Sequence, residues 1–190
     1  MQIETRGQPA TLHVVPSKDQ ILSPEINIRS ESDIQSPQSL RAIATLSDVR
    51  GDVRFTPGGG VLFDTPISRA ERDSIAQPIE TPARLIDLPQ DRYNLTYAQN
   101  SEFRAFIDGY TVAHARNGYR LVVIALQSAI RPAQLRLIAD VAEVFGHSTI
   151  RLTAGVSIRL PNVPVALLRP LWSKLDAAGL LSVGARKLAA

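Results

Sequence analysis

The second half of the chain alternates between segments with the apolar spacing of a strand and segments with that of a helix. Residues 118–126 are apolar and β-branched, which is typical of a strand buried on both faces. In residues 132–145, apolar side chains recur along one helical face, between Pro132 at the first helical position and Gly146 as the stop. The predicted elements, in order, are strand 118–126, helix 132–145, strands 148–153 and 156–160, and helix 166–178.

Two further features frame this unit. Residues 101–118 place four large apolar side chains, from Phe103 to Tyr110, on one helical face, and we expect them to form a helix that caps the unit. The strand at 156–160 is expected to end at Pro161, because proline has no backbone N–H to donate within a sheet.

The first half of the chain repeats the pattern of the second. Residues 37–51 (PQSLRAIATLSDVRG) match residues 132–146 (PAQLRLIADVAEVFG) at seven identical positions. After a two-residue insertion, residues 53–63 match residues 150–160, and Arg54 then aligns with Arg151. Upstream, residues 25–32 fall on residues 120–127, and both segments are strand-like. Three consecutive matching blocks with one small gap predict an internal duplication of a β-α-β-β-α unit, and therefore an α+β fold.

The elements of the first copy follow from this alignment. We expect them in the order strand 25–29, helix 37–50, strands 52–56 and 60–64, and helix 68–77, with an additional strand at 11–15. The glycines at 58–60 are interpreted as a hairpin turn, since the residues after them are strand-like rather than helical. Residues 78–97 have several prolines and no period, which indicates a connector. The predicted division is 1–80, a connector at 81–100, and 101–190.

Composition narrows the possible chemistry. The chain has 190 residues, of which 44% are hydrophobic and 21% charged, as in ordinary globular proteins. It has no cysteine and three scattered histidines, which excludes disulfides and cysteine-bound metal or iron–sulfur sites within this chain. Neither a membrane-spanning run nor a secretion signal is present in the sequence, so a cytoplasmic protein is expected.

Charge is distributed unevenly along the chain. The net charge of +3 divides into −3 up to residue 95 and +6 from residue 96 onward, where nine of the eleven basic residues are arginines. Guanidinium groups bind carboxylate and phosphate in a bidentate manner, so the second half could meet an anionic ligand or an acidic partner. A nucleic-acid partner is disfavoured, because the charge is small and no binding motif is present.

The second copy resembles the ferredoxin-like half domain of siroheme-dependent nitrite and sulfite reductases and of the related precorrin-3B synthase of cobalamin biosynthesis. The motifs that carry the resemblance are PAQLRLIADVAEVFG at 132–146, TIRLT at 149–153 and LWSKLDAAGLL at 171–181, in the family's order and spacing. In the first copy, RFTPGGGVL at 54–62 is similar to a variant of the same strand motif. The resemblance implies two tandem ferredoxin-like half domains packed about a pseudo-twofold axis.

The resemblance also implies a role for strand arginines, which in this family contact siroheme carboxylates or the bound oxyanion. The candidate anion- or siroheme-contacting residues are Arg54, Thr56, Arg116, Arg120, Arg151, Thr153 and Arg159. The alternative is that Arg54 and Arg151 pair with carboxylates of the protein itself and brace the fold. The family's own contacting arginine is absent, since glycine stands at that position in both copies, at Gly58 and Gly155.

Three functions are compatible with these observations. The first is an accessory or N-terminal module of a nitrite/sulfite-reductase-type oxidoreductase, with siroheme and an iron–sulfur cluster held by a downstream domain or a partner subunit. The second is a stand-alone binding or scaffold protein, because a fold does not fix a function. The third is a fragment similar to precorrin-3B synthase. We expect no catalysis and no bound cofactor from the isolated chain, since it has no cysteine to carry the metal chemistry.

Overall fold

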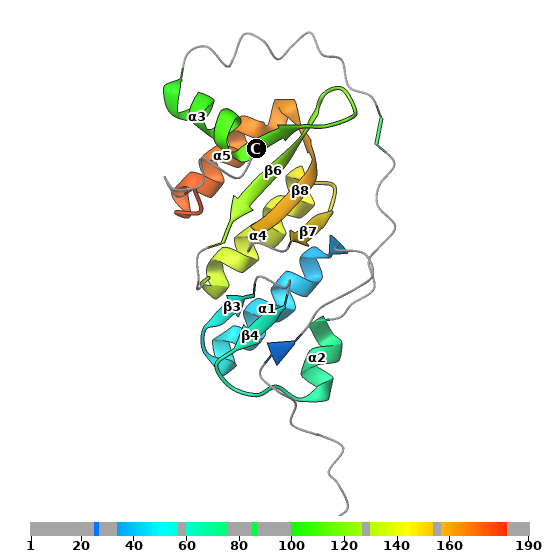
Figure 1. Cartoon of the computed structure of the whole chain (residues 1–190), viewed down its shortest axis with the longest axis vertical. Helices are drawn as coiled ribbons and strands as arrows, with labels where there is room; N and C mark the ends of the chain where they lie inside the picture. Colours follow the sequence, from blue (N-terminus) through cyan, green and yellow to red (C-terminus); the bar gives the residue numbers. More distant parts are fainter. Residues whose placement is uncertain are drawn as a thin grey trace, which may run out of the picture.

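The computed structural model describes residues 25–26, 34–56, 60–75, 85–86, 100–126, 130–153 and 157–181. These residues form two α+β units, each with its own antiparallel sheet (Figure 1). The units meet through the long helices α1 (Pro37–Arg50) and α4 (Pro132–Phe145), which lie side by side at the centre of the molecule. The predicted strand at 11–15 and the predicted connector lie almost entirely outside the described residues.

The first unit contains α1, a three-stranded sheet and a short second helix. Its strands are β1 (Glu25–Ile26), β3 (Val53–Phe55) and β4 (Val61–Phe63), in the order β1-β4-β3, and its second helix is α2 (Arg69–Ile75). The Ser36 side chain caps α1 by accepting a hydrogen bond from the Ser39 N–H, and Pro37 occupies the first helical position. The antiparallel pairing of β3 with β4 agrees with the predicted hairpin, although residues 57–59 of its turn lie outside the described residues.

The second unit repeats this arrangement and extends it. Its elements are α3 (Ser101–Tyr110), β5 (Thr111–Ala113), β6 (Tyr119–Ala125), α4, β7 (Ile150–Thr153), β8 (Ser157–Pro164), a 3-10 turn (Val165–Leu167) and α5 (Leu168–Ala177). Three strands follow the order β6-β8-β7, which corresponds to β1-β4-β3 of the first unit. The predicted fold class is therefore confirmed.

Two boundaries differ from those expected. The helix that begins at Ser101 ends at Tyr110, because β-branched Thr111 and Val112 leave it to form β5, which pairs with β6. Strand β8 continues through Pro161 to Pro164. The pairing of β6 with β8 shifts register between Arg120 and Val122, so the proline lies at an irregularity of the ladder where its missing N–H has little cost.

Strand pairing also joins the two units. Strand β2 (Ile34–Gln35), which the sequence pattern does not reveal, belongs to the first half of the chain but pairs with β7 through Gln35 and Ile150. In return, Val53 at the start of β3 forms an isolated bridge with Ile130, just before α4. Gln35 and Ile130 occupy equivalent positions in the sequence repeat, as do Val53 and Ile150. The inter-unit contacts are thus reciprocal, as a twofold relation between the units requires.

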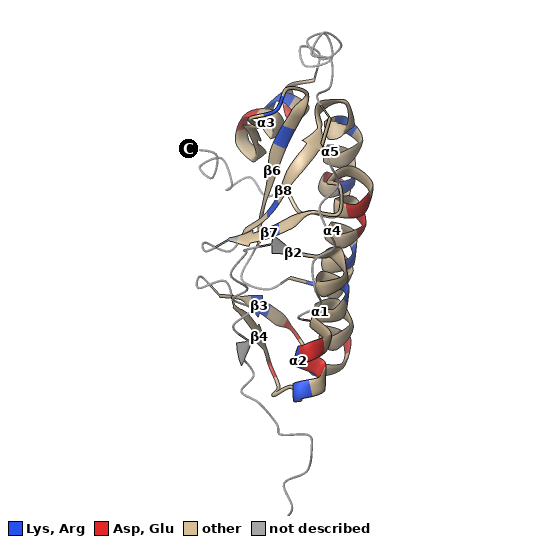
Figure 2. Cartoon of the chain, turned by 90° about the vertical axis from the view of Figure 1, so that its right-hand side faces the viewer, with Lys and Arg blue, Asp and Glu red and all other residues tan. Residues whose placement is uncertain are grey.

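Helices and strands form two layers with one continuous core between them. Figure 2 shows α5, α4, α1 and α2 along one side of the molecule and the strands along the other. Leu40 and Ile43 of α1 and Leu135 and Ile138 of α4 are almost fully buried in a single cluster that contains both sheets. The opposite face of each sheet carries the strand residues that alternate with these core residues. Among the described residues, no helix has both the length and the apolar character that crossing a membrane requires.

Candidate functional site: paired arginines on the second sheet

Two candidate arginines lie directly opposite each other on neighbouring strands. Arg151 of β7 pairs with Arg159 of β8 in the antiparallel register. Each follows a buried isoleucine, Ile150 or Ile158, whose side chain joins the core on the helix side. Because successive side chains of a strand point to opposite faces, both guanidinium groups belong to the face away from α4. We call this pair of arginines the arginine site.

The two positive charges of the arginine site are not balanced by a negative side chain in the described part of the chain. Arg151 is exposed and Arg159 half-buried, and no ion pair to either is present in the described part of the chain. The Nε of Arg159 is buried and has no hydrogen-bond partner among the described residues. Like charges directly across a strand pair are destabilising, and a buried donor without an acceptor costs free energy. An anion placed between the two guanidinium groups would relieve both costs.

The surroundings of Arg159 are partly sheltered from water. Its other cross-strand neighbour is Val123 of β6, which is 3% exposed although it lies on the same sheet face. Ser157, two residues before Arg159 on β8, is 4% exposed. A charge-assisted hydrogen bond is stronger in such a setting than in open water, because the local dielectric constant is lower.

In the first unit, the candidate residues Arg54 and Thr56, equivalent to Arg151 and Thr153, bind other groups of the chain, and Leu62 stands at the position of Arg159. Arg54 donates from Nη2 to Asp64 Oδ1 at 2.9 Å, so it pairs across the β3–β4 hairpin. Thr56 Oγ1 accepts the Gly60 N–H at 3.0 Å and closes the turn of that hairpin. For Arg54, the bracing interpretation agrees with the observed contact.

The remaining candidates do not join the arginine site. The Arg120 Nε donates to Thr111 Oγ1 at 2.6 Å, which ties β6 to the end of α3. Arg116 donates from Nη1 to the Leu85 carbonyl at 2.7 Å and so holds a segment before the second unit. The side chain of Thr153 lies outside the described residues, although its backbone pairs with Ser157.

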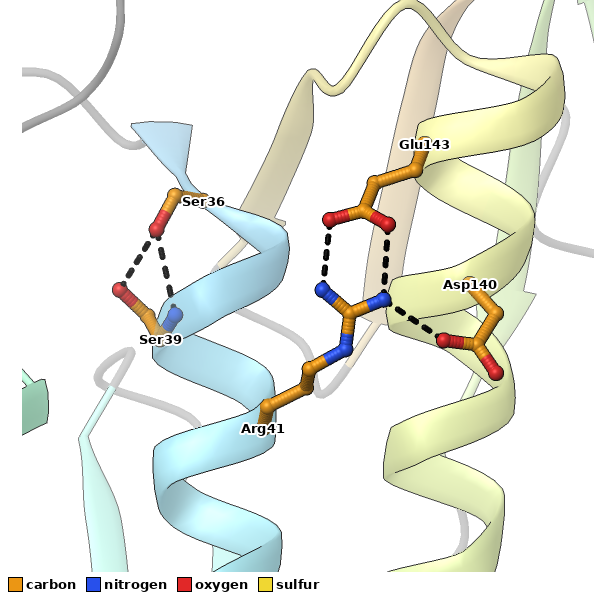
Figure 3. Close-up of polar contacts among 5 residues, drawn as sticks. All are labelled: Ser36, Ser39, Arg41, Asp140 and Glu143. Carbon is orange, nitrogen blue, oxygen red and sulfur yellow. Dashed lines mark hydrogen bonds and ion pairs between the residues drawn. The ribbon is translucent and has the colours of Figure 1, made fainter.

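A second cluster of charges, not anticipated from the sequence, braces the two units. Figure 3 shows Arg41 of α1 reaching across to α4, where both of its terminal nitrogens bind the Glu143 carboxylate and Nη2 also binds Asp140. The hydrogen bond to Glu143 is the main cause of a raised Arg41 pKa, and the same bond lowers the pKa of Glu143. Arg136, equivalent to Arg41 in the repeat, contacts Asp48, which is equivalent to Glu143. These arginines hold the α1–α4 interface rather than a ligand.

The described residues offer no cluster of side chains suited to a metal centre. It has no cysteine, and no group of three histidine or acidic side chains in the described part could hold a metal ion. Siroheme would bring several carboxylates, each of which would need its own cationic or hydrogen-bonding partner. The arginine site, with its unpartnered Arg159 Nε, fits a single anionic group but does not fit a whole siroheme.

A comparison against known families matches most of the second unit. A family model described as the nitrite/sulfite reductase ferredoxin-like half domain matches residues 114–178, which run from the end of β5 through α5. This segment is a nitrite/sulfite reductase ferredoxin-like half domain. Comparisons with the curated proteins and with the solved structures found no significant match. The half domain contains both members of the arginine site, and their strands are the β7–β8 hairpin of that domain.

Proposed function

We propose that this chain is a non-catalytic module of a nitrite/sulfite-reductase-type siroheme oxidoreductase, in which the arginine site meets an anionic group. The observation that carries the proposal is the buried Nε of Arg159, which has no partner among the described residues and whose residue pairs in register with Arg151 on a half domain of this family. Nothing in the fold neutralises this pair within the described residues, whereas the equivalent Arg54 has Asp64. The metal centre would come from a downstream domain or a partner subunit.

The shared chemistry of the ligand is an oxyanion with two acceptor oxygens. Two sources supply it in this setting, namely a carboxylate on the rim of a tetrapyrrole and a small inorganic oxyanion such as sulfite. A bidentate carboxylate and a compact oxyanion both match the donor geometry of guanidinium.

The test measures binding of each source to the full chain. Uroporphyrin, a metal-free tetrapyrrole polycarboxylate, and sulfite are titrated separately by calorimetry. We expect saturable binding that weakens about tenfold or more in both Arg151→Gln and Arg159→Gln, since charge-assisted hydrogen bonds contribute about 1.5–3 kcal/mol. Arg104→Gln, which removes an exposed arginine on α3, is the matched control and should bind like the parent chain. Tighter binding of one probe identifies the source.

The proposal fails if neither anion binds, or if the two site variants and the control bind equally. A separate measurement concerns the cofactor. After incubation with siroheme and desalting, the isolated chain should retain no stoichiometric Soret absorbance, because it has no cysteine and lacks the family's arginine at Gly58 and Gly155. Retention of one siroheme per chain would contradict the non-catalytic assignment.

A further inference from the structure

A pocket between α3 and α5 lies outside the arginine site. It has a volume of about 260 Å³, near the lower end for sites that enclose small molecules. Its lining residues are Glu102, Ala105, Phe106 and Tyr110 of α3, Trp172 and Asp176 of α5, and Leu181. The pocket thus combines three aromatic side chains with two carboxylates.

Aromatic side chains are concentrated here to an unusual degree. The whole chain has ten, and four of them form one connected cluster of Phe103, Phe106, Tyr110 and Trp172. Elsewhere the buried core is mostly leucine, isoleucine and valine, and its aromatic members, Phe55, Phe63, Tyr119 and Phe145, lie on several different elements. Arg169 already lies over the Phe103 ring, 5.9 Å from its centroid, so a cation occupies one face of the cluster.

Neither carboxylate is paired within the described residues, although Glu102 lies in the first turn of α3, where the helix dipole favours a negative charge. Glu102 and Asp176 are exposed, and neither forms an ion pair or a side-chain hydrogen bond with another described residue. Asp176 lies in the last turn of α5, where the helix dipole disfavours a negative charge. Residues 96–190 contain only five acidic side chains against eleven basic ones, and two of the five line this pocket. The charge of the pocket lining is therefore opposite to the net charge of the second half of the chain.

We propose that this pocket binds a small organic cation with an apolar body. The ammonium group would lie between Glu102 and Asp176, and the apolar body would pack against Phe106, Tyr110 and Trp172. Carboxylates and aromatic faces both favour a cation, and the aromatic walls favour a ligand with an apolar part over a simple inorganic ion. This inference is independent of the proposed function, because it concerns other elements and a ligand of opposite charge.

The only tryptophan of the chain lines the pocket, so its fluorescence can report ligand binding. Trp172 fluorescence is followed while the full chain is titrated with phenethylamine, and separately with 2-phenylethanol, which has a similar shape without the charge. We expect a saturable change with the amine and at least fivefold weaker binding of the alcohol. Glu102→Gln and Asp176→Asn should each weaken amine binding at least threefold.

Asp108→Asn is the matched control, because Asp108 is an exposed acid on α3 that does not line the pocket. It should bind the amine like the parent chain. The proposal is overturned if the amine gives no saturable change across the millimolar range, if the alcohol binds equally well, or if Glu102→Gln, Asp176→Asn and Asp108→Asn behave alike. Arg159→Gln should leave amine binding unchanged, so failure of the anion proposal and failure of this one are distinguishable.

Discussion

Arg41 and Glu143, 102 residues apart in the sequence, form a two-point ion pair across the interface between α1 and α4. The repeat places Arg136 and Asp48 at the equivalent positions, and they are also in contact. The same interaction is therefore made twice, once from each helix. This reciprocity supports the duplication that the sequence predicts, because two unrelated units would have no reason to share it.

The Arg41–Glu143 pair should contribute modestly to stability. Both side chains are about one-third exposed, so solvent screens the pair, whereas its bidentate geometry favours a value at the upper end for surface pairs. A double-mutant cycle with Arg41→Ala and Glu143→Ala, measured by urea unfolding, should give a coupling of about 1 kcal/mol. The Arg136–Asp48 cycle is the internal comparison and should give less, because Thr45 stands where α4 has Asp140. A coupling of zero for both pairs would show that the interface depends on apolar packing alone.

Stability should fall in acid through Glu143 and Glu71. The hydrogen bond from Arg41 lowers the pKa of Glu143, and the Ser68 N–H, followed by Arg50, lowers the pKa of Glu71 below its ordinary value of 4.5. A carboxyl group whose pKa is lower in the folded state stabilises the chain above the unfolded value and loses this contribution as pH falls through the folded value. When thermal unfolding is measured from pH 6 to pH 3, the melting temperature should therefore fall more steeply with pH below about pH 4.5. Glu143→Gln should flatten that dependence, whereas Asp108→Asn should leave it unchanged.

Glycine is required at Gly51 for two separate reasons. Its φ of +91° is one that side chains rarely adopt, and a Cβ there would lie 3.2 Å from Asp64 Oδ2. Gly51→Ala should cost about 1–2 kcal/mol, because the strain adds to a displacement of the Arg54–Asp64 pair. Gly179→Ala is the comparison, since Gly179 has a φ of +65° but no atom near its added Cβ. Equal losses of stability would mean that the contact with Asp64 is unimportant.

The arginine site should lower the free energy of unfolding of the chain. Replacing Arg159 with methionine removes the cross-strand repulsion from Arg151 and the unpartnered Nε, while keeping much of the side-chain length. We expect Arg159→Met to raise the free energy of unfolding by about 0.5–1 kcal/mol and to abolish anion binding. Arg104→Met is the control and should change neither quantity appreciably. A destabilised Arg159→Met would indicate that the guanidinium supports the fold.

Local signals predict the helices at the interface correctly. Proline at the first position and glycine after the last, in Pro37 and Gly51 and again in Pro132 and Gly146, define α1 and α4 to within a residue. The missed strands show the limit of such signals. Strand β2 is two residues long and exists because β7 of the other unit presents an edge, so no periodicity in its own sequence could reveal it.

For the candidate site, too, the sequence indicates which residues are involved but not how they are arranged. Arginine and its strand context identify Arg151 and Arg159 as candidates, but their direct opposition depends on the register of the β7–β8 hairpin. Register follows from turn geometry, which the residue pattern does not specify. The assignment of Arg54 to Asp64, and of Arg120 to Thr111, likewise depends on which side chains the sheet brings together. The aromatic pocket requires α5 to pack near α3, a tertiary relation without a signature in either helix.

The exchange of strands between the units also affects how the chain meets other molecules. A sheet that ended at β7 would present a row of unpaired N–H and carbonyl groups to any extended polypeptide. Strand β2 covers that row with only two residues, and Pro37 then turns the chain into a helix. The edge strand of the larger sheet next to β7 is thus too short for a further strand to pair with it stably. In the described residues, the first half of the chain thus protects an edge of the second half's sheet, and the second half would lack this protection against self-association on its own.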